Sequence, residues 1–237
     1  MFNYFDRVIR GTEREDNLKI VEFLKGMVGQ TFSFLNYYKE IPVSYDAKLL
    51  SIENEMAEFD IHEYQAKVIT LERQALIYAH EKNSLKDDMV AEAFYVNVAK
   101  KRTILCKFGY AKISAHLRRF VRVLVDIPVD ANLFFEENNI QGKIVDISIG
   151  GMAIRTESNE LLHSGLVVNM ILLLPDSQNG AINKVELSGT IVKVLAEETT
   201  SVCYLEFNTE NKTHQQISYF INQRQVEIIK GLKDEIP

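Results

Sequence analysis

Two short motifs carry the side chains of this chain that are best suited to binding a charged ligand. The first is an R-x-x-x-R pattern with Arg118 and Arg122 at its ends. The second begins 24 residues after Arg122 and reads D-x-S-x-x-G, with Asp146, Ser148 and Gly151 at its defined positions. Together they offer two guanidinium groups, a carboxylate, a hydroxyl and a backbone position without a side chain. This set suits a ligand that carries both phosphates and guanines.

The arginine motif has two interpretations. A guanidinium group binds a phosphate, or the O6/N7 edge of guanine, through two hydrogen bonds, and it also stacks on a purine ring. Arg118 and Arg122 lie four residues apart at a junction of linker and strand, so they can hold opposite sides of one nucleotide. In the alternative, Arg118 and Arg119 are solvated linker residues. Arg122 then pairs with an acid such as Asp126 or Asp146.

The D-x-S-x-x-G motif also allows a functional and a purely structural interpretation. Side chains alternate along a strand, so Asp146 and Ser148 share one face while Ile147 faces the core. The carboxylate can accept hydrogen bonds from guanine N1–H and N2–H₂, and the hydroxyl can serve a base or a phosphate. Gly151 permits close approach of the backbone to a ligand. Alternatively the motif is an ordinary β-turn, which Asp, Ser and Gly all favour.

The two motifs, in this order and at this separation, resemble the PilZ family of bacterial receptors for cyclic di-GMP. The resemblance covers about residues 114–230. It implies a six-stranded β-barrel that binds cyclic di-GMP without turning it over, so no enzyme activity is expected. It also implies the ligand-binding residues: Arg118 and Arg122 for phosphate and guanine, Asp146 and Ser148 for a guanine, and Gly151 for room at the pocket wall. Arg119 is expected as an extra phosphate contact.

One position next to the first motif bears on the number of ligands. Leu117 precedes Arg118, where many relatives carry a basic or polar residue. An arginine there can help to stack a second, intercalated cyclic di-GMP, and leucine cannot. We therefore expect one ligand per site.

The charge of the chain is unevenly distributed. The net charge is −6, yet residues 93–125 contain no Asp or Glu and eight Lys or Arg residues. Such a local basic field attracts a small anion, while the overall acidity makes DNA a poor partner. The two cysteines and five histidines show no ligand spacing, so neither a metal nor a cofactor is expected.

The composition indicates a soluble protein. No apolar run approaches the roughly 20 residues that span a bilayer, so no membrane insertion is expected. The first ten residues lack the basic-then-apolar order of a signal peptide. The expected location is therefore cytoplasmic.

The periodicity of the sequence predicts a mainly β fold: two small antiparallel β-barrel domains in tandem, with an N-terminal and a C-terminal helix. The first domain, residues 1–113, begins with a helix at about 13–28, started by a capping box at Thr12 and Glu15, and continues with about six strands. The second, residues 114–237, comprises the arginine linker, a strand series from residue 120 with a turn at residues 138–139, and a helix at about 213–230 that stops near Gly231. The apolar stripe of that helix is Ile217, Phe220, Ile221 and Ile228.

The order of the two domains looks like that of flagellar-brake-type receptors. It implies that cyclic di-GMP orders the linker and re-orients the domains, and that a protein partner senses the change. A flagellar motor component, a polysaccharide synthase and an adhesion regulator are the expected kinds of partner, with motility or biofilm formation as output. Two alternatives stay open: a PilZ-fold scaffold that binds no nucleotide, and an enzyme with paired carboxylates. The C-terminal helix suits intramolecular packing or a homodimer equally.

Overall fold

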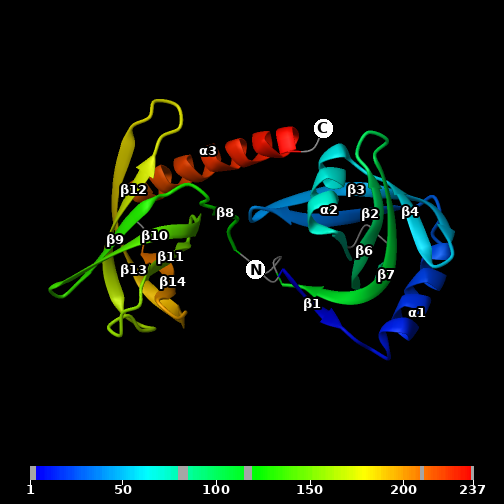
Figure 1. Ribbon diagram of the computed structural model, residues 1–237, viewed down its shortest axis with the longest axis horizontal. Coiled ribbons are helices and arrows are strands. Elements are labelled where there is room, and N and C mark those ends of the chain that lie inside the picture. Colours follow the sequence, from blue (N-terminus) through cyan, green and yellow to red (C-terminus); the bar gives the residue numbers. More distant parts are fainter. Residues whose placement is uncertain (1–3, 80–84, 115–118, 209–210, 236–237) are drawn as a thin grey trace. The chain divides into compact units, whose positions relative to one another are not determined.

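The computed structural model describes residues 4–79, 85–114, 119–208 and 211–235 and is mainly β (Figure 1). The chain divides into two compact units. The first comprises residues 1–38, 42–119 and 231–237, and the second comprises residues 39–41 and 120–230. Each unit contains a closed barrel of six strands, which confirms the predicted fold class. Arg118 and its neighbours 115–117, Leu117 included, lie outside the described residues.

The barrel of the first unit is antiparallel. Its strands are β2 (Thr31–Tyr38), β3 (Ile41–Glu53), β4 (Met56–Asp60), β5 (Gln74–Tyr78), β6 (Asp88–Asn97) and β7 (Arg102–Ile113). They are hydrogen-bonded in the order β7-β4-β3-β2-β5-β6, and pairing of β6 with β7 closes the ring. A short strand, β1 (Phe5–Val8), adds to the edge of β7.

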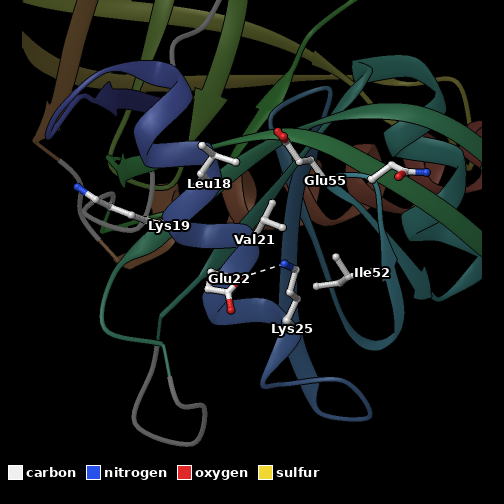
Figure 2. A pocket seen from close by; sticks show the side chains of 8 residues that line it. Leu18, Lys19, Val21, Glu22, Lys25, Ile52 and Glu55 are labelled. Carbon is white, nitrogen blue, oxygen red and sulfur yellow. Dashed lines mark hydrogen bonds and ion pairs between the residues drawn. The ribbon is translucent and has the colours of Figure 1, made fainter.

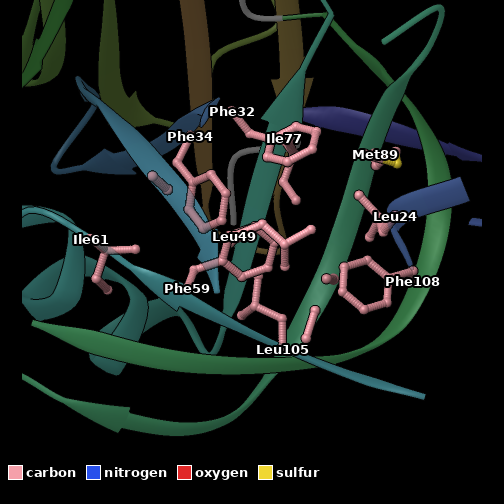
Figure 3. Close-up of a cluster of buried hydrophobic side chains, with 14 of the residues drawn as sticks. Leu24, Phe32, Phe34, Leu49, Phe59, Ile61, Ile77, Met89, Leu105 and Phe108 are labelled. Atoms are coloured by element: carbon pink, nitrogen blue, oxygen red, sulfur yellow. The ribbon is translucent and has the colours of Figure 1, made fainter. Parts of the chain in front are cut away.

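The interior of this barrel is filled by aromatic and branched side chains, among them Phe34, Phe59 and Phe108 (Figure 3). Helix α1 (Glu13–Lys25) contributes Ile20 and Leu24 to the same core. The predicted capping box is confirmed at the start of α1. The helix ends at Lys25, three residues earlier than predicted, and the expected apolar position Val28 is exposed.

Helix α2 (Glu63–Glu72) is an element that the sequence pattern does not predict. Ala66, Val68 and Ile69 are all fully buried, and the same helix buries Gln65 and Lys67. Buried residues on several faces of a ten-residue helix give weak helical periodicity, so the segment carries little amphipathic signal. The tertiary environment decides this element.

The second unit repeats the architecture. Its strands are β8 (Arg122–Leu124), β9 (Asp130–Phe135), β10 (Asn138–Ser148), β11 (Gly151–Glu157), β12 (Val167–Pro175), β13 (Ile182–Ala196) and β14 (Thr200–Asn208). The order β11-β14-β13-β12-β9-β10 closes through the β10–β11 pair, and β8 lies beside the end of β10. The predicted turn at residues 138–139 is wrong, because Asn138 already pairs with Phe135. The tight turn precedes it, at Glu136, whose φ is 50°.

Helix α3 (Asn211–Glu235) closes the chain. All of the predicted stripe is buried: Ile217, Phe220, Ile221 and Ile228. The prediction that the helix stops near Gly231 is wrong. Gly231 has no positive φ, the helix continues, and Leu232 beyond it is fully buried, so burial of the last turn outweighs the helix-breaking tendency of glycine. No helix in the described residues has the length and apolarity to cross a membrane.

Candidate ligand-binding site

The two motifs meet where β8 pairs with the end of β10. Arg122 lies opposite Ser148, and Leu124 lies opposite Asp146, in an antiparallel register. Cross-strand partners share a face of the sheet, and residues two apart on one strand do so as well. Arg122, Asp146 and Ser148 therefore lie on one face of this ladder, while Val123 and Ile147 are buried in the core on the other.

Arg122 and Asp146 form an ion pair in this arrangement. The Nη1 atom of Arg122 lies 3.5 Å from Oδ1 of Asp146. The Asp146 side chain is fully buried, whereas one third of the Arg122 side chain is exposed. Pairing of Arg122 with Asp146 is one of the structural alternatives raised by the sequence. The pair places a cation at the surface and its partner carboxylate beneath it.

Ser148 and Gly151 close the turn between β10 and β11. The Ser148 hydroxyl donates to the Gly151 carbonyl at 3.1 Å. A Cβ atom at Gly151 would lie 2.2 Å from the carbonyl oxygen of Leu205 on β14, so no larger residue fits there without moving backbone. The packing of β11 on β14 thus accounts for this glycine, with or without a ligand. The Ser148 hydroxyl thus points to a backbone carbonyl and helps to close the turn.

The remaining predicted site residues belong to the arginine segment. Arg119 is exposed, and Arg118 lies outside the described residues. The geometry therefore brings together Arg122, Asp146 and Ser148, with Gly151 beside them.

A second ion-pair network lies close to the first motif in sequence. Arg224 of α3 is buried and donates to Asp126 through Nη2 and to Glu227 through Nη1. Asp126 also accepts a hydrogen bond of 2.9 Å from Lys39, which belongs to the same unit. Desolvation acts to raise the pKa of Asp126, but the hydrogen bond from Lys39 and the charge of Arg224 outweigh it and hold the pKa below its usual value.

Sequence reasoning missed this network, although a signal for it exists. Position 224 lies three residues after Ile221 and four before Ile228, on the apolar stripe of α3. A charged residue on such a stripe indicates a buried partner.

Helix α3 makes a second polar contact through Gln223. Its side chain donates a hydrogen bond of 2.8 Å to Asp176, and this bond is the main cause that lowers the pKa of the Asp176 carboxyl.

The first unit has a groove of its own between α1 and the β3–β4 hairpin (Figure 2). It is lined by Leu18, Lys19, Val21, Glu22, Lys25, Ile52, Asn54 and Glu55. Its charges are mixed, and Lys25 already pairs with Glu22 at 2.9 Å. The groove contains none of the predicted site residues.

Comparison with known protein families matches residues 116–223 to the PilZ domain. This stretch is a PilZ domain. The match spans both motifs and the whole second barrel, so it confirms the resemblance drawn from the two motifs. The PilZ domain carries Arg122 on its first strand and Asp146, Ser148 and Gly151 around its β10–β11 turn. No curated protein matches the chain.

Solved structures that are similar to this chain include three proteins. The Bacillus subtilis inhibitor of motility (MotI/DgrA) is 15% identical over 84% of this chain and 97% of its own, with a TM-score of 0.43. Escherichia coli YcgR in complex with c-di-GMP is 13% identical over 98% and 96%, with a TM-score of 0.43. The K. pneumonia MrkH–c-di-GMP complex is 14% identical over 97% and 100%, also with a TM-score of 0.43.

Proposed function

We propose that the protein is a cyclic di-GMP receptor whose binding residues are Arg118, Arg119, Arg122, Asp146, Ser148 and Gly151. The observation that carries the proposal is the common face of Arg122, Asp146 and Ser148 at the β8–β10 ladder of a PilZ domain. PilZ domains form a family of cyclic di-GMP receptors. The exposed guanidinium and the carboxylate below it match the phosphates and the guanine N–H groups of that ligand.

Binding requires a rearrangement of the Arg122–Asp146 pair. A ligand phosphate competes for Arg122 and a guanine edge competes for Asp146, so each partner exchanges one charge-assisted contact for another. The 3.5 Å separation is longer than the roughly 2.7–2.9 Å of a charge-assisted hydrogen bond, which favours exchange of this contact for ligand contacts. The ligand-free pairing thus keeps the carboxylate compensated until a guanine arrives.

In this proposal the output is a change in the orientation of the two units. Cyclic di-GMP orders the arginine segment that joins them and binds one orientation better than the others. A protein partner, such as a flagellar motor component, a polysaccharide synthase or an adhesion regulator, then senses the new surface. Small-angle scattering with and without the ligand tests this step, and an unchanged radius of gyration at saturating ligand would contradict it.

The decisive experiment is isothermal titration calorimetry with cyclic di-GMP. We expect saturable binding with one ligand per site, and a loss of affinity of at least about tenfold in Arg118→Ala, because hydrogen bonds to charged groups contribute about 1.5–3 kcal/mol. Cyclic di-AMP is the ligand control, because it keeps the phosphates and lacks guanine. Lys112→Ala is the protein control, because Lys112 is an exposed cation of the same basic stretch outside the motif.

The outcomes separate the candidate functions. Binding that Lys112→Ala retains and Arg118→Ala loses supports the receptor. Equal losses in both variants would indicate general attraction by the basic stretch. No heat from the unmodified protein, with no retention of labelled ligand on a filter, would instead favour a PilZ-fold scaffold. Chromatography of the incubated ligand tests for hydrolysis, and intact cyclic di-GMP is the expected result.

A further inference from the structure

The ring of Phe120 lies against Gly150, a residue that neither motif defines. An ideal Cβ atom at Gly150 would lie 2.7 Å from Cδ2 and 2.8 Å from Cε2 of Phe120. The two residues lie just beyond the last pair of the β8–β10 ladder, in which Arg122 lies opposite Ser148. Phe120 precedes Arg122 by two residues and Gly150 follows Ser148 by two, in the β10–β11 turn. The ring therefore occupies the space that a side chain at Gly150 would take.

The backbone does not require a glycine at this position. Gly150 has no positive φ, so an L-residue can adopt its conformation. The three atoms nearest to an added Cβ all belong to Phe120, and the third is already 3.9 Å away. Gly151 differs, because there a Cβ meets backbone of β14. The glycine at 150 is thus explained by the aromatic ring, and an aromatic residue paired with glycine is a known way to fix register between strands.

This contact lies at the start of a short strand. Strand β8 contains only three residues, so it has few ladder hydrogen bonds. Phe120 lies two residues before Arg122 and is half-buried. Its ring contributes apolar burial next to the residue whose guanidinium reaches Asp146. Without the ring, position 120 loses its contact with Gly150, in the turn after Ser148.

We infer that Phe120 and Gly150 form a positioning pair for the binding site. The ring on the glycine holds the backbone of Arg122 in register with Ser148, so that Arg122, Asp146 and Ser148 share one face before the ligand exchanges their side-chain contacts. Ligand binding then costs less ordering entropy, which raises the affinity. This inference rests on the proposed function, and it assigns to two uncharged residues a part of the affinity for cyclic di-GMP.

A double-mutant cycle with cyclic di-GMP tests the pair. Phe120→Ala and Gly150→Ala are each expected to weaken binding by about tenfold. A tenfold loss lies within the range of about 0.5–3 kcal/mol by which residues in direct contact couple. In the Phe120→Ala background, Gly150→Ala is expected to add no further loss, because the ring that clashes with its Cβ is gone. Independent losses that multiply in the double variant would overturn the inference. Phe120→Tyr keeps the ring and is expected to retain the affinity.

Tryptophan fluorescence tests the contact between residues 120 and 150 without any ligand. The chain contains no tryptophan, so Phe120→Trp carries the only indole and its fluorescence reports position 120 alone. We expect a blue-shifted emission that acrylamide quenches poorly, and a red shift when Gly150→Ala is added. A solvent-like emission that Gly150→Ala leaves unchanged would overturn the inference. Circular dichroism of each variant controls for folding.

The two measurements separate this inference from the proposed function. An unmodified protein that binds no cyclic di-GMP, with an indole that responds to Gly150→Ala, would contradict the proposed ligand and support the positioning contact. An unmodified protein that binds, with affinities that are equal in all four members of the cycle, would support the receptor and overturn the positioning role.

Discussion

Arg122 and Asp146 meet across the β8–β10 ladder, where the guanidinium Nη1 lies 3.5 Å from a carboxylate that is fully buried. The arginine comes from the first motif and the carboxylate from the second, 24 residues later. The two side chains expected to bind a ligand thus form an ion pair with each other in the ligand-free protein. This relationship makes both residues testable for stability as well as for binding.

Replacement of Arg122 by Ala is expected to lower the free energy of unfolding by about 1–2 kcal/mol, because a buried carboxylate loses a charged partner. Asp146→Asn keeps the shape and removes the charge, so it is expected to cost less stability than Arg122→Ala and still to weaken cyclic di-GMP binding. Urea unfolding measures the first effect and calorimetry the second. Stability unchanged in Arg122→Ala would show that the pair contributes nothing to the fold.

The same substitution at two glycines is expected to act in opposite directions. Gly151→Ala places a Cβ atom on the Leu205 carbonyl and is expected to destabilise the protein by about 1–3 kcal/mol, the usual cost of overpacking. Gly231→Ala lies in α3, meets nothing within 4 Å and is expected to stabilise by about 0.5–1 kcal/mol. Thermal or urea unfolding of the two variants checks both signs. A Gly151→Ala protein as stable as the parent would contradict the tight packing of β11 on β14.

Because Arg224 is buried, we expect loss of its partner charge at Asp126 to lower the free energy of unfolding more than replacement of Arg224 itself by an apolar residue. Asp126→Asn leaves Glu227 as the ionic partner of Arg224 among the described residues. We expect a loss of about 1–3 kcal/mol in the free energy of unfolding, less than for a fully buried pair, because Asp126 is partly exposed. Arg224→Met fills the stripe of α3 with an apolar side chain and is expected to be near neutral. Chemical denaturation of the two variants measures both losses in the free energy of unfolding. A larger loss in Arg224→Met than in Asp126→Asn would show that the ionic network itself holds the helix.

Acid stability follows from the lowered pKa values of Asp126 and Asp176. A carboxyl whose folded pKa is lower than its unfolded pKa adds stability above the unfolded value of about 3.9, and this is lost as the pH falls through the folded value. We therefore expect the melting temperature to fall from about pH 4 downward. Asp126→Asn is expected to show a shallower fall over that range. A parallel pH profile for the variant and the parent would exclude a contribution from Asp126.

Much of the fold was predictable from the sequence, because its elements are coded locally. Thr12 and Glu15 form the capping box that starts α1, and the stripe of Ile217, Phe220, Ile221 and Ile228 faces inward on α3. Alternating side chains and short spacings marked most strands of both barrels. The two motifs were enough to indicate the PilZ domain, because the resemblance rests on residue types, order and spacing, which the sequence contains in full.

Tertiary structure alone decided the rest. Helix α2 forms although its periodicity is weak, and α3 runs through Gly231, because burial of side chains outweighs local propensity in both places. The pairing of Arg122 with Asp146, of Arg224 with Asp126 and of Phe120 with Gly150 depends on strand register and helix packing. Residue spacing places Arg224 on an apolar stripe and leaves Asp146 as one possible partner of Arg122. It does not fix these contacts, since they join positions that only the folded chain brings within a few ångströms of each other.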